Sequence, residues 1–582
     1  MVSIIRVNMN ELKVTVEDLP ADYNLLGGRG LTSRVVHDEV PPDCHPLGPY
    51  NKIVIAPGVV SGTNAPSSGR VSVGGKSPLT GGIKEANAGT PVAQKLGRLR
   101  IKAVIVEGKP AEKGSWLLKI NKDGGELVPA DSLEGKVTSE VNRALFNDYG
   151  EKAGVITIGP AGENRMSMAG ICFNDTEGRA SRYAGRGGLG AVMGSKGLKA
   201  VVIDETDAPK VEIKDPDLFK TGAKKLNEGL RSHFATKPGG TLNSFGTAAL
   251  INILNEAGGL PTRNFSEGVF EGARQISGET ISDKVQQRGG SGMMGHSCHP
   301  GCVIRCSNVY PKADGSEHVS CIEYESDWAF GANCGIDNLD HIAELIRLCN
   351  DYGVDTIEAG VTMAVAMEAG LAEFGDGEAA IRLMQEIGNN SPLGRILGNG
   401  SYFTGTAYGL TRIPVVKKQG MPAYDPRAVK GIGVTYITSP MGADHTAGYT
   451  IAPEILSVGG QVDPLETSDK TELSRTFQQV TAFIDSIGYC LFIAFAILDY
   501  PDANEGMVET VNAVLGTEYT PDDVPKVGTE ILKMERDFNR KAGITNESDR
   551  PPEFMRYESL PPHNHIFDIS EGKLDSVWDY LE

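Results

Sequence analysis

The sequence has little that would attach the protein to a membrane or to nucleic acid. Its longest notable apolar run, Leu491 to Leu498, is far shorter than the roughly 20 residues that cross a bilayer, and predicts a buried helix instead. The first residues lack the basic start, long apolar segment and small-residue cleavage site of a signal peptide. No basic block offsets the formal net charge of −19, which disfavours a polyanionic partner. We therefore expect a cytoplasmic protein that binds neither membrane nor nucleic acid.

The sequence also lacks the signs of a disulfide framework and of disorder. Its nine cysteines are an odd number, and no secretion signal accompanies them, so thiolate chemistry or plain burial must account for them. No polar low-complexity tract is long enough to indicate disorder. At 582 residues the chain exceeds the roughly 250 to 300 residues that one hydrophobic core supports, which predicts two or three domains.

Strand-like and helix-like patterns occupy different parts of the chain. Short β-rich runs separated by Gly, Pro and Asp fill the first 200 or so residues. Beyond about residue 209 apolar residues recur three and four apart, as in amphipathic helices. Prolines and glycines in residues 412–427 then interrupt the helical pattern. These patterns predict an α+β protein with a β-rich domain over 1–208 and two mainly α-helical domains over 209–418 and 419–582.

Two glycine-rich segments of the β-rich part are candidate ligand cradles. Residues 61–90 carry Arg70 and Asn87 among Gly, Ser and Thr. Residues 182–196 place Arg182 and Arg186 around a second glycine cluster. Glycines let the backbone approach a ligand closely, successive N–H groups can bind an anion, and a guanidinium offers paired donors to a phosphate. The plain alternatives are surface hairpins and ordinary surface charges.

The second cluster contains a G-x-G-x-x-G pattern at Gly185, Gly187 and Gly190, which by itself suggests a dinucleotide fold. The residues before it, EGRASRYA, are not an apolar strand, and Gly194 and Gly197 would break the following helix within two turns. A dinucleotide site is therefore the second interpretation of this segment.

Three cysteines, Cys298, Cys302 and Cys306, lie within nine residues. Such spacing favours a metal or iron–sulfur site, held by a loop because Pro300 and Gly301 disfavour a continuous helix. Zinc would take the same ligands, so the local sequence leaves zinc and iron open. A fourth ligand is needed, and Cys490 is the candidate, although a small core residue explains it equally well. The remaining cysteines are interpreted as buried or incidental; they are Cys44, Cys172, Cys321, Cys334 and Cys349.

Taken together, these segments resemble the tungsten-containing aldehyde ferredoxin oxidoreductase family over nearly the whole chain. The order and spacing of several short motifs carry the resemblance. They are GGRG at 27–30, the segments around Arg70 and Asn87, AGRGGLGAVMGSK at 184–196, the three-cysteine segment, EYE at 323–325, NDYGVDT at 350–356, PAYDPR at 422–427, GADH at 442–445 and DSIGYC at 485–490.

The resemblance implies that two pterin molecules hold a tungsten or sometimes a molybdenum atom between a β-rich first domain and two helical domains. It also implies a 4Fe-4S cluster on Cys298, Cys302, Cys306 and Cys490. The residues it assigns to the pterin phosphates and their bridging magnesium are Arg70, Asn87, Gly89, Arg182, Ala184, Gly185 and Arg186.

Two related motifs, NDYGVD and DSIGYC, hydrogen-bond the pterin ring systems in the resembling family. This assigns Asn350, Asp355 and Asp485 to pterin recognition, a task that suits a carboxylate because it accepts hydrogen bonds. The plain alternative for Asp355 is the start of a helix, since Asp355 and Glu358 have the spacing of a capping box.

The chain departs from the family at two points. Three residues separate the first two cysteines, where two are common, and Met441 stands where an arginine often precedes the active histidine. The first departure affects the path of the cysteine loop, and the second affects charge near the substrate.

The resemblance further implies oxidation of a small aldehyde to a carboxylic acid. Glu325, or alternatively Glu323, would act as the base, and His445 would polarise the carbonyl oxygen or relay a proton. Electrons would pass to a ferredoxin or a small Fe–S subunit, and the sequence leaves a homo- or hetero-oligomer open. The alternatives are a low-potential reductase acting on an aromatic thioester and a non-redox protein stabilised by zinc.

Overall fold

The computed structural model describes residues 2–581 and begins with two six-stranded sheets. The first has the order β2-β1-β6-β3-β4-β5, in which only β1 and β6 pair in parallel. Its strands are β1 (Ser3–Asn8), β2 (Lys13–Asp18), β3 (Ile53–Pro57), β4 (Arg70–Lys76), β5 (Ile83–Gly89) and β6 (Ile101–Glu107).

The second sheet repeats the topology of the first. Taken from the other edge, its strand order is β8-β7-β12-β9-β10-β11, which is the order of the first sheet with each strand number raised by six. The parallel pair of the second sheet, β7 with β12, corresponds to the parallel pair β1 with β6 of the first sheet. Its strands are β7 (Trp116–Asn121), β8 (Gly124–Pro129), β9 (Gly154–Thr157), β10 (Ile171–Asn174), β11 (Ala180–Ala184) and β12 (Leu198–Ile203). The edge strands β5 and β11 lie against one another, so equivalent ends of the two repeats meet.

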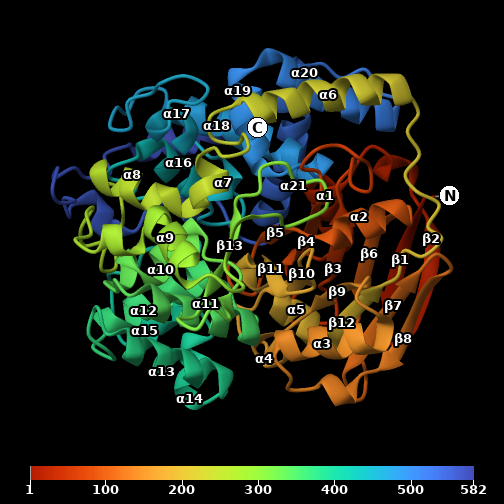
Figure 1. Cartoon of the computed structure of the whole chain (residues 1–582), viewed down its shortest axis with the longest axis horizontal. Helices are drawn as coiled ribbons and strands as arrows, with labels where there is room; N and C mark the ends of the chain where they lie inside the picture. The colour runs from red at the N-terminus through yellow and green to blue at the C-terminus, as the bar shows by residue number, and fades with distance from the viewer. Residues whose placement is uncertain (1, 582) are drawn as a thin grey trace.

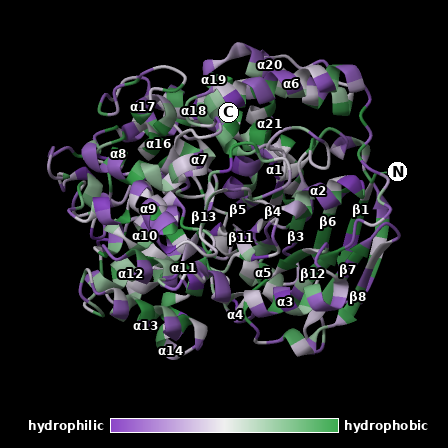
Figure 2. Cartoon of the chain, in the orientation of Figure 1, coloured by the Kyte–Doolittle hydropathy of each residue, from purple (hydrophilic) through white to green (hydrophobic). Residues whose placement is uncertain are grey.

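The strands form where the sequence is rich in Val and Ile, and their inner faces supply one shared core. Every residue of β3 and β12 is buried, as expected for strands covered on both faces. Figure 2 shows hydrophobic colouring on the strands near β6 and β7 and more purple on outer helices such as α3 and α6. The β-rich runs of the sequence coincide with β1, β2, β3, β6, β7, β9 and β12, as predicted, whereas β4, β5, β8, β10 and β11 were not indicated.

The first part of the chain also contains helices that the sequence pattern did not indicate. They are α1 (Gly28–Glu39), α2 (Pro91–Arg98), α3 (Thr138–Tyr149), α4 (Pro160–Glu163) and α5 (Leu189–Ser195). Most are short or glycine-containing, so their apolar period is weak. The start of α2 has the residues that favour a helix N-terminus. The Thr90 side chain caps the helix by accepting from Val92 N, and Pro91 occupies the first turn.

The rest of the chain is mainly helical, with a small sheet around the cysteine segment. Its middle elements are α6 (Pro216–Ser232), α7 (Thr241–Phe245), α8 (Leu250–Glu256), α9 (Gly278–Arg288), β13 (Met293–His296), β14 (Ser307–Pro311), β15 (Glu317–Val319), α10 (Tyr324–Phe330), α11 (Leu339–Tyr352), α12 (Thr356–Glu368), α13 (Gly377–Gly388), α14 (Pro392–Leu397) and α15 (Ser401–Ala407). The last are β16 (Val415–Val416), β17 (Gln419–Gly420), α16 (Lys430–Thr438), α17 (Ile451–Ile455), α18 (Lys470–Ile487), α19 (Ala494–Asp499), α20 (Pro501–Leu515), α21 (Val524–Lys541) and α22 (Glu571–Asp575).

The predicted fold class is confirmed: a sheet-rich first part is followed by helices, as Figure 1 shows in red to orange and then green to blue. The strands β13 to β15 were not predicted. The domain boundaries stay a prediction, and α6, which follows the first boundary, packs along α20 of the last part. Within residues 2–581, no helix combines the length and apolarity that crossing a bilayer requires.

A buried ion pair joins the first part of the chain to the last. Arg29 in α1 donates from Nε and Nη2 to the two carboxylate oxygens of Glu535 in α21, at 2.9 and 2.8 Å. Both side chains are almost fully buried, and Ser33 Oγ donates to the same carboxylate. The geometry is bidentate, which suits a charge pair removed from water.

We expect Glu535→Ala to lower the free energy of unfolding by about 3–5 kcal/mol, because it leaves the Arg29 charge buried without its main partner. Urea titration of the purified protein measures the change. Glu126→Ala is the matched control: it removes the exposed partner of Lys119, which should cost less than about 1 kcal/mol. Equal losses of unfolding free energy in Glu535→Ala and Glu126→Ala would contradict the stabilising role of the buried pair Arg29 and Glu535.

Candidate active site

A cavity of about 380 Å³ lies where the ends of the two sheets meet the helices of the later chain. Its walls come from β4 and β5, from β11 and the loop after it, from α10, from the junction of α11 and α12, and from the end of α18. The predicted site residues that line it are Arg70, Asn87, Gly89, Arg182, Gly185, Arg186, Cys298, Cys302, Cys306, Glu325, Asn350, Asp355, His445, Asp485 and Cys490. Ala184 is buried at the end of β11, next to the lining residue Gly185.

The four predicted cysteine ligands reach this cavity from two distant segments. Cys298, Cys302 and Cys306 belong to the loop between β13 and β14, and Cys490 follows α18. The segment at Ser67 holds the two together: its carbonyl accepts from Cys490 N at 2.9 Å, and its N–H donates to Gly301 O at 3.0 Å. The chain thereby brings all four thiols to one cavity wall.

The extra residue in the cysteine loop places a histidine beside the thiols. His299 is fully buried, and its Nδ1 lies 3.1 Å from Cys298 Sγ. Its Nε2 has no hydrogen-bond partner among the described residues. The ligand atoms of Cys298, His299 and Cys302 lie within 4.8 Å of one another, which is close enough for one metal centre. On the other side a Cβ at Gly89 would stand 2.7 Å from Cys298 Sγ, so only glycine fits there.

The end of the first sheet forms a chain of polar side chains along the cavity. Arg70 Nε donates to Asn87 Oδ1 at 2.7 Å, and Asn87 Nδ2 donates to Asp485 Oδ1 at 3.3 Å. Arg29 approaches the other oxygen of Asp485 at 3.5 Å. Burial raises the pKa of Asp485 to about 6 and that of the adjacent Glu85 to about 7, and the Asp485 carboxylate raises the pKa of Glu85 further. Glu85 Oε1 has no hydrogen-bond partner within residues 2–581.

The end of the second sheet forms a similar group. Arg182 Nη2 donates to Ser307 Oγ at 2.7 Å, and its Nε has no hydrogen-bond partner in the part of the chain that the structure describes. Arg186 Nε donates to Asp355 Oδ2 at 3.1 Å and its other nitrogens donate to Ala443 O and Gly420 O. Arg186 thus fixes Asp355 and links the sheet to two later segments.

Asp355 begins α12, as the sequence predicted, but the capping box is incomplete. Its carboxylate accepts from Ile357 N at 3.1 Å. Glu358 does not reciprocate: its carboxylate accepts from the N–H groups of Ser401 and Gly420 instead. The prediction of a reciprocal box was wrong because a neighbouring helix and hairpin offered buried donors that needed an acceptor.

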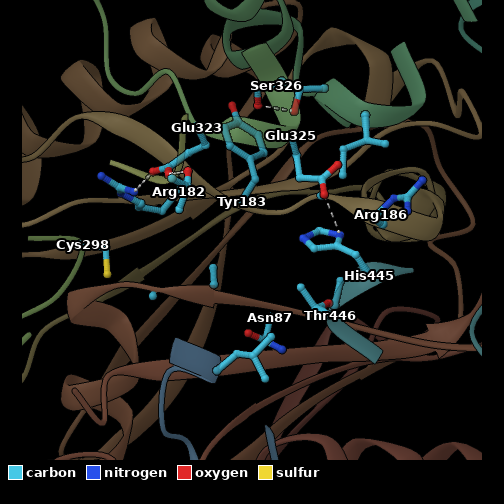
Figure 3. A pocket seen from close by; sticks show the side chains of 18 of the residues that line it. Asn87, Arg182, Tyr183, Arg186, Cys298, Glu323, Glu325, Ser326, His445 and Thr446 are labelled. Carbon is cyan, nitrogen blue, oxygen red and sulfur yellow. Dashed lines mark hydrogen bonds and ion pairs between the residues drawn. The ribbon is translucent and has the colours of Figure 1, made fainter. Parts of the chain in front are cut away.

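Glu325 and His445 face one another inside the cavity, as Figure 3 shows. His445 Nδ1 lies 3.4 Å from Glu325 Oε1, and Glu325 Oε2 accepts from Ala423 N at 3.0 Å. Neither Nδ1 nor Oε1 has a hydrogen-bond partner among the described residues. Burial raises the pKa of Glu325 to about 8 and lowers that of His445 to about 4. The pair is therefore uncharged at neutral pH.

A buried lysine lies near Met441, at the position where the resembling family was expected to have an arginine. Lys84 Nζ donates to Asp444 Oδ2 at 3.1 Å and approaches Met441 O at 3.5 Å. Lys84 and Arg186 hold the pKa of Asp444 well below its usual range although the residue is buried. A cation thus lies near His445, supplied by β5 of the first sheet.

Comparison with known proteins identifies the family. The family model described as aldehyde ferredoxin oxidoreductase, N-terminal domain, matches residues 4–205, and that described as domains 2 and 3 matches residues 222–578. A tungsten-containing aldehyde ferredoxin oxidoreductase of Thermococcus kodakarensis is 38% identical over 96% of this chain and 91% of its own. One of Pyrococcus furiosus is also 38% identical, over the same shares of the two chains. The chain belongs to the aldehyde ferredoxin oxidoreductase family.

A solved structure shares the fold. The BamBC active-site complex of benzoyl-coenzyme A reductase with 1,5-dienoyl-CoA contains a chain that matches with a TM-score of 0.81 and 20% sequence identity, covering 100% of this chain and 94% of the other. At that identity the likeness concerns the fold alone.

The fold excludes the dinucleotide interpretation of the G-x-G-x-x-G segment. The residues before it do form a strand, β11, which the sequence analysis did not predict. However, β11, β10, β9 and β12 pair antiparallel in succession, so β11 and β12 run in opposite directions. A dinucleotide-binding unit needs two parallel strands joined by the helix, and this family member does not provide them.

The residues of this family member fit a metal-bound organic phosphate ligand and a cysteine-held metal. Glu85, Arg182 and Glu325 line the cavity, and each has a buried polar atom without a hydrogen-bond partner among the described residues. Such an atom lowers the stability of the fold unless a ligand or a water molecule bonds to it. At Gly185 the atom nearest to an added Cβ, Asp355 Oδ1, would be 3.6 Å away. A ligand can therefore approach the backbone at Gly185.

Among the further residues that line the cavity are Arg29, Glu85 and Cys321. Arg29 lies in the GGRG motif but was given no role, Cys321 is buried as expected but also faces the cavity, and Glu85 was missed because a single charged residue within a strand carries no spacing signal.

We expect Cys490→Ala to lower the content of the metal bound by the cysteine loop, iron or zinc, because a four-ligand site with one thiol missing binds metal more weakly. Elemental analysis per chain gives the measurement. Cys349→Ala is the control, since Cys349 is a fully buried core residue of α11. Full metal content in Cys490→Ala would show that this thiol is only a core residue.

Proposed function

We propose that the protein oxidises aldehydes to carboxylic acids at a tungsten centre held by two pterins. The names of its relatives and the match over nearly the whole chain support this reaction. In this chain the main observation in favour of aldehyde oxidation is that Glu325 and His445 face one another. They line the same cavity as the predicted pterin-binding residues and the four cysteines. Conversion of an aldehyde and water to an acid releases two electrons and two protons, so both an electron acceptor and a proton acceptor are required.

The two repeats would each hold one pterin. Arg70, Asn87 and Asp485 lie together at the end of the first sheet, and Arg182, Arg186 and Asp355 occupy the equivalent place at the end of the second. The arginines suit phosphate groups and the carboxylates suit the N–H groups of pterin rings. By the same resemblance, a magnesium ion would bridge the phosphates. The bound metal and pterin supply the redox change that side chains cannot provide.

Glu325 would take a proton from water or from the hydrated aldehyde. In the buried pair the proton resides on the Glu325 carboxyl near neutral pH, because its pKa of about 8 exceeds that of His445. A neutral His445 whose unprotonated Nδ1 faces this carboxyl would carry its proton on Nε2, and that N–H would be available to polarise a carbonyl oxygen. Tyr424 and Tyr449 pack against the His445 ring and are buried, which limits water around the reacting carbon.

The cysteines would hold a 4Fe-4S cluster as the exit for electrons. Cys298, Cys302, Cys306 and Cys490 provide the four thiolates such a cluster needs. The electrons would leave singly to a ferredoxin or a small Fe–S subunit, an external partner that the family name indicates for the relatives.

The decisive experiment is elemental analysis and aldehyde assay of anaerobically purified protein. We expect tungsten or molybdenum together with iron, and aldehyde-dependent reduction of a low-potential dye. Zinc alone would contradict the proposal and favour a structural zinc site. Tungsten and iron without oxidation of any tested aldehyde would instead favour a reductive reaction on the same scaffold.

The pH dependence tests the role of Glu325. A base is active as the carboxylate, which forms above a pKa of about 8, so kcat/KM should rise about tenfold per pH unit from pH 6 and level off above 8. Glu325→Gln should lower kcat/KM by roughly 10² to 10⁴ and remove this rise while keeping its tungsten. Glu323→Gln, which changes the other candidate glutamate, should keep the rise. Loss of the rise in Glu323→Gln alone would reverse the assignment.

A further inference from the structure

The three residues between the first two cysteines of the loop form a tight turn with the second cysteine. Cys302 N donates to the carbonyl oxygen of His299 at 3.2 Å, which closes a β-turn over residues 299–302. Pro300 occupies the second position of this turn, and Gly301 occupies the third with a φ of +85°, as in a type II turn. His299 is thereby held at the first position of the turn, directly after Cys298.

The His299 ring is wedged between the cysteine loop and the backbone of the first sheet. The side chain is fully buried. A Cβ at Gly69, just before β4, would stand 2.3 Å from Cδ2 and 2.4 Å from Cγ of the ring, so the ring lies directly on this backbone. His299 is not among the residues within 2–581 that line the catalytic cavity, whereas Cys298 is. The ring therefore reaches the site through the Cys298 sulfur, which lies 3.1 Å from Nδ1.

The contact between Nδ1 and the sulfur determines where the ring carries its proton. A thiolate that binds a metal has no proton to donate, so this contact is a hydrogen bond only when Nδ1 is the donor. Nε2 has no hydrogen-bond partner in the part of the chain that the structure describes. A second N–H at Nε2 would place a charged ring and an unsatisfied donor in the interior, which costs free energy. The neutral ring protonated at Nδ1 is the form that fits.

We propose that His299 donates a hydrogen bond from Nδ1 to the Cys298 thiolate and thereby raises the reduction potential of the iron–sulfur cluster. This inference rests on the proposed function, because it needs the cluster that the four cysteines would hold. Reduction adds negative charge that spreads onto the thiolate sulfurs, and an N–H donor stabilises that more negative state. Cys302 Sγ accepts from the backbone N–H of Arg305 at 3.4 Å. The donor at Cys298 belongs to a side chain and can be removed by substitution.

The test compares His299→Leu, which has no donor, with His299→Asn, whose Nδ2 can donate from about the position of Nδ1. We expect His299→Leu to lower the ratio of reduced to oxidised cluster about tenfold at a fixed solution potential, which is a downward shift of about 59 mV for one electron. His299→Asn should retain most of the original potential. A redox titration of the anaerobically purified protein, followed by the EPR signal of the reduced cluster, measures both.

His318→Leu is the matched control. His318 is a mostly buried histidine of β15 whose Nε2 lies 3.1 Å from Glu344 Oε2, and it is outside the cavity wall within residues 2–581. Its removal should leave the potential of the cluster unchanged. Iron content per chain confirms that each variant holds the cluster.

Labelling the histidines with ¹⁵N tests the contact in the unsubstituted protein and needs no variant. We expect pulsed EPR of the reduced cluster to show one weak nitrogen coupling, as for a ring nitrogen that is hydrogen-bonded to a ligand sulfur. A strong coupling would make His299 an iron ligand, and the absence of any coupling would show that the ring does not contact the cluster. Either result would overturn the inference.

The outcomes separate this inference from the proposed function. An iron-loaded His299→Leu with the potential of the unsubstituted protein would overturn the role of His299 and leave aldehyde oxidation standing. Zinc in place of iron in the unsubstituted protein would refute the proposed electron exit, and the role of His299 with it.

Discussion

The burial of several charges at one place is the constraint on which the rest of the structure depends. Arg29, Arg186 and Lys84 lie in an interior from which water is excluded, so each needs an anionic partner. Those partners, Glu535, Asp355 and Asp444, belong to helices and loops that lie 169 to 506 residues later in the chain. The sheets and the helical parts must therefore close together around the cavity, and the same charges then surround its ligand.

Duplication of the sheet explains why the candidate site has two similar halves. The ends of β5 and β11 are equivalent in the two repeats and lie against one another. Each carries an arginine-containing cradle, and each receives a carboxylate from a later helix, Asp485 or Asp355. The proposed pair of pterins on one metal would need two such cradles facing one space, and the repeated sheet topology offers two.

The cavity beside Glu325 and His445 has polar and apolar sides. Glu325 and His445 form a pair that is uncharged at neutral pH because both are buried, and Lys84 supplies a cation nearby through Asp444. On the far side of Tyr449 the walls are hydrocarbon. The two sides of Tyr449 thus differ: polar and ionisable groups line one side, and hydrocarbon lines the other.

The sequence by itself determined seven of the twelve strands in the first part, the helical character of the later chain, the α+β class and, through motif order, the family. Those features depend on local periodicity and on short segments, which a linear pattern records. It did not indicate α1, the strands β13 to β15, or the roles of Arg29, Glu85 and Lys84, whose local pattern is weak. Only the tertiary structure decided that Ser67 joins Cys490 to the cysteine loop, that Glu358 caps Ser401 and Gly420 rather than its own helix, and that Phe492 and Phe495 wall a cavity. Such contacts join residues distant in sequence, and their energy depends on burial that no local pattern encodes.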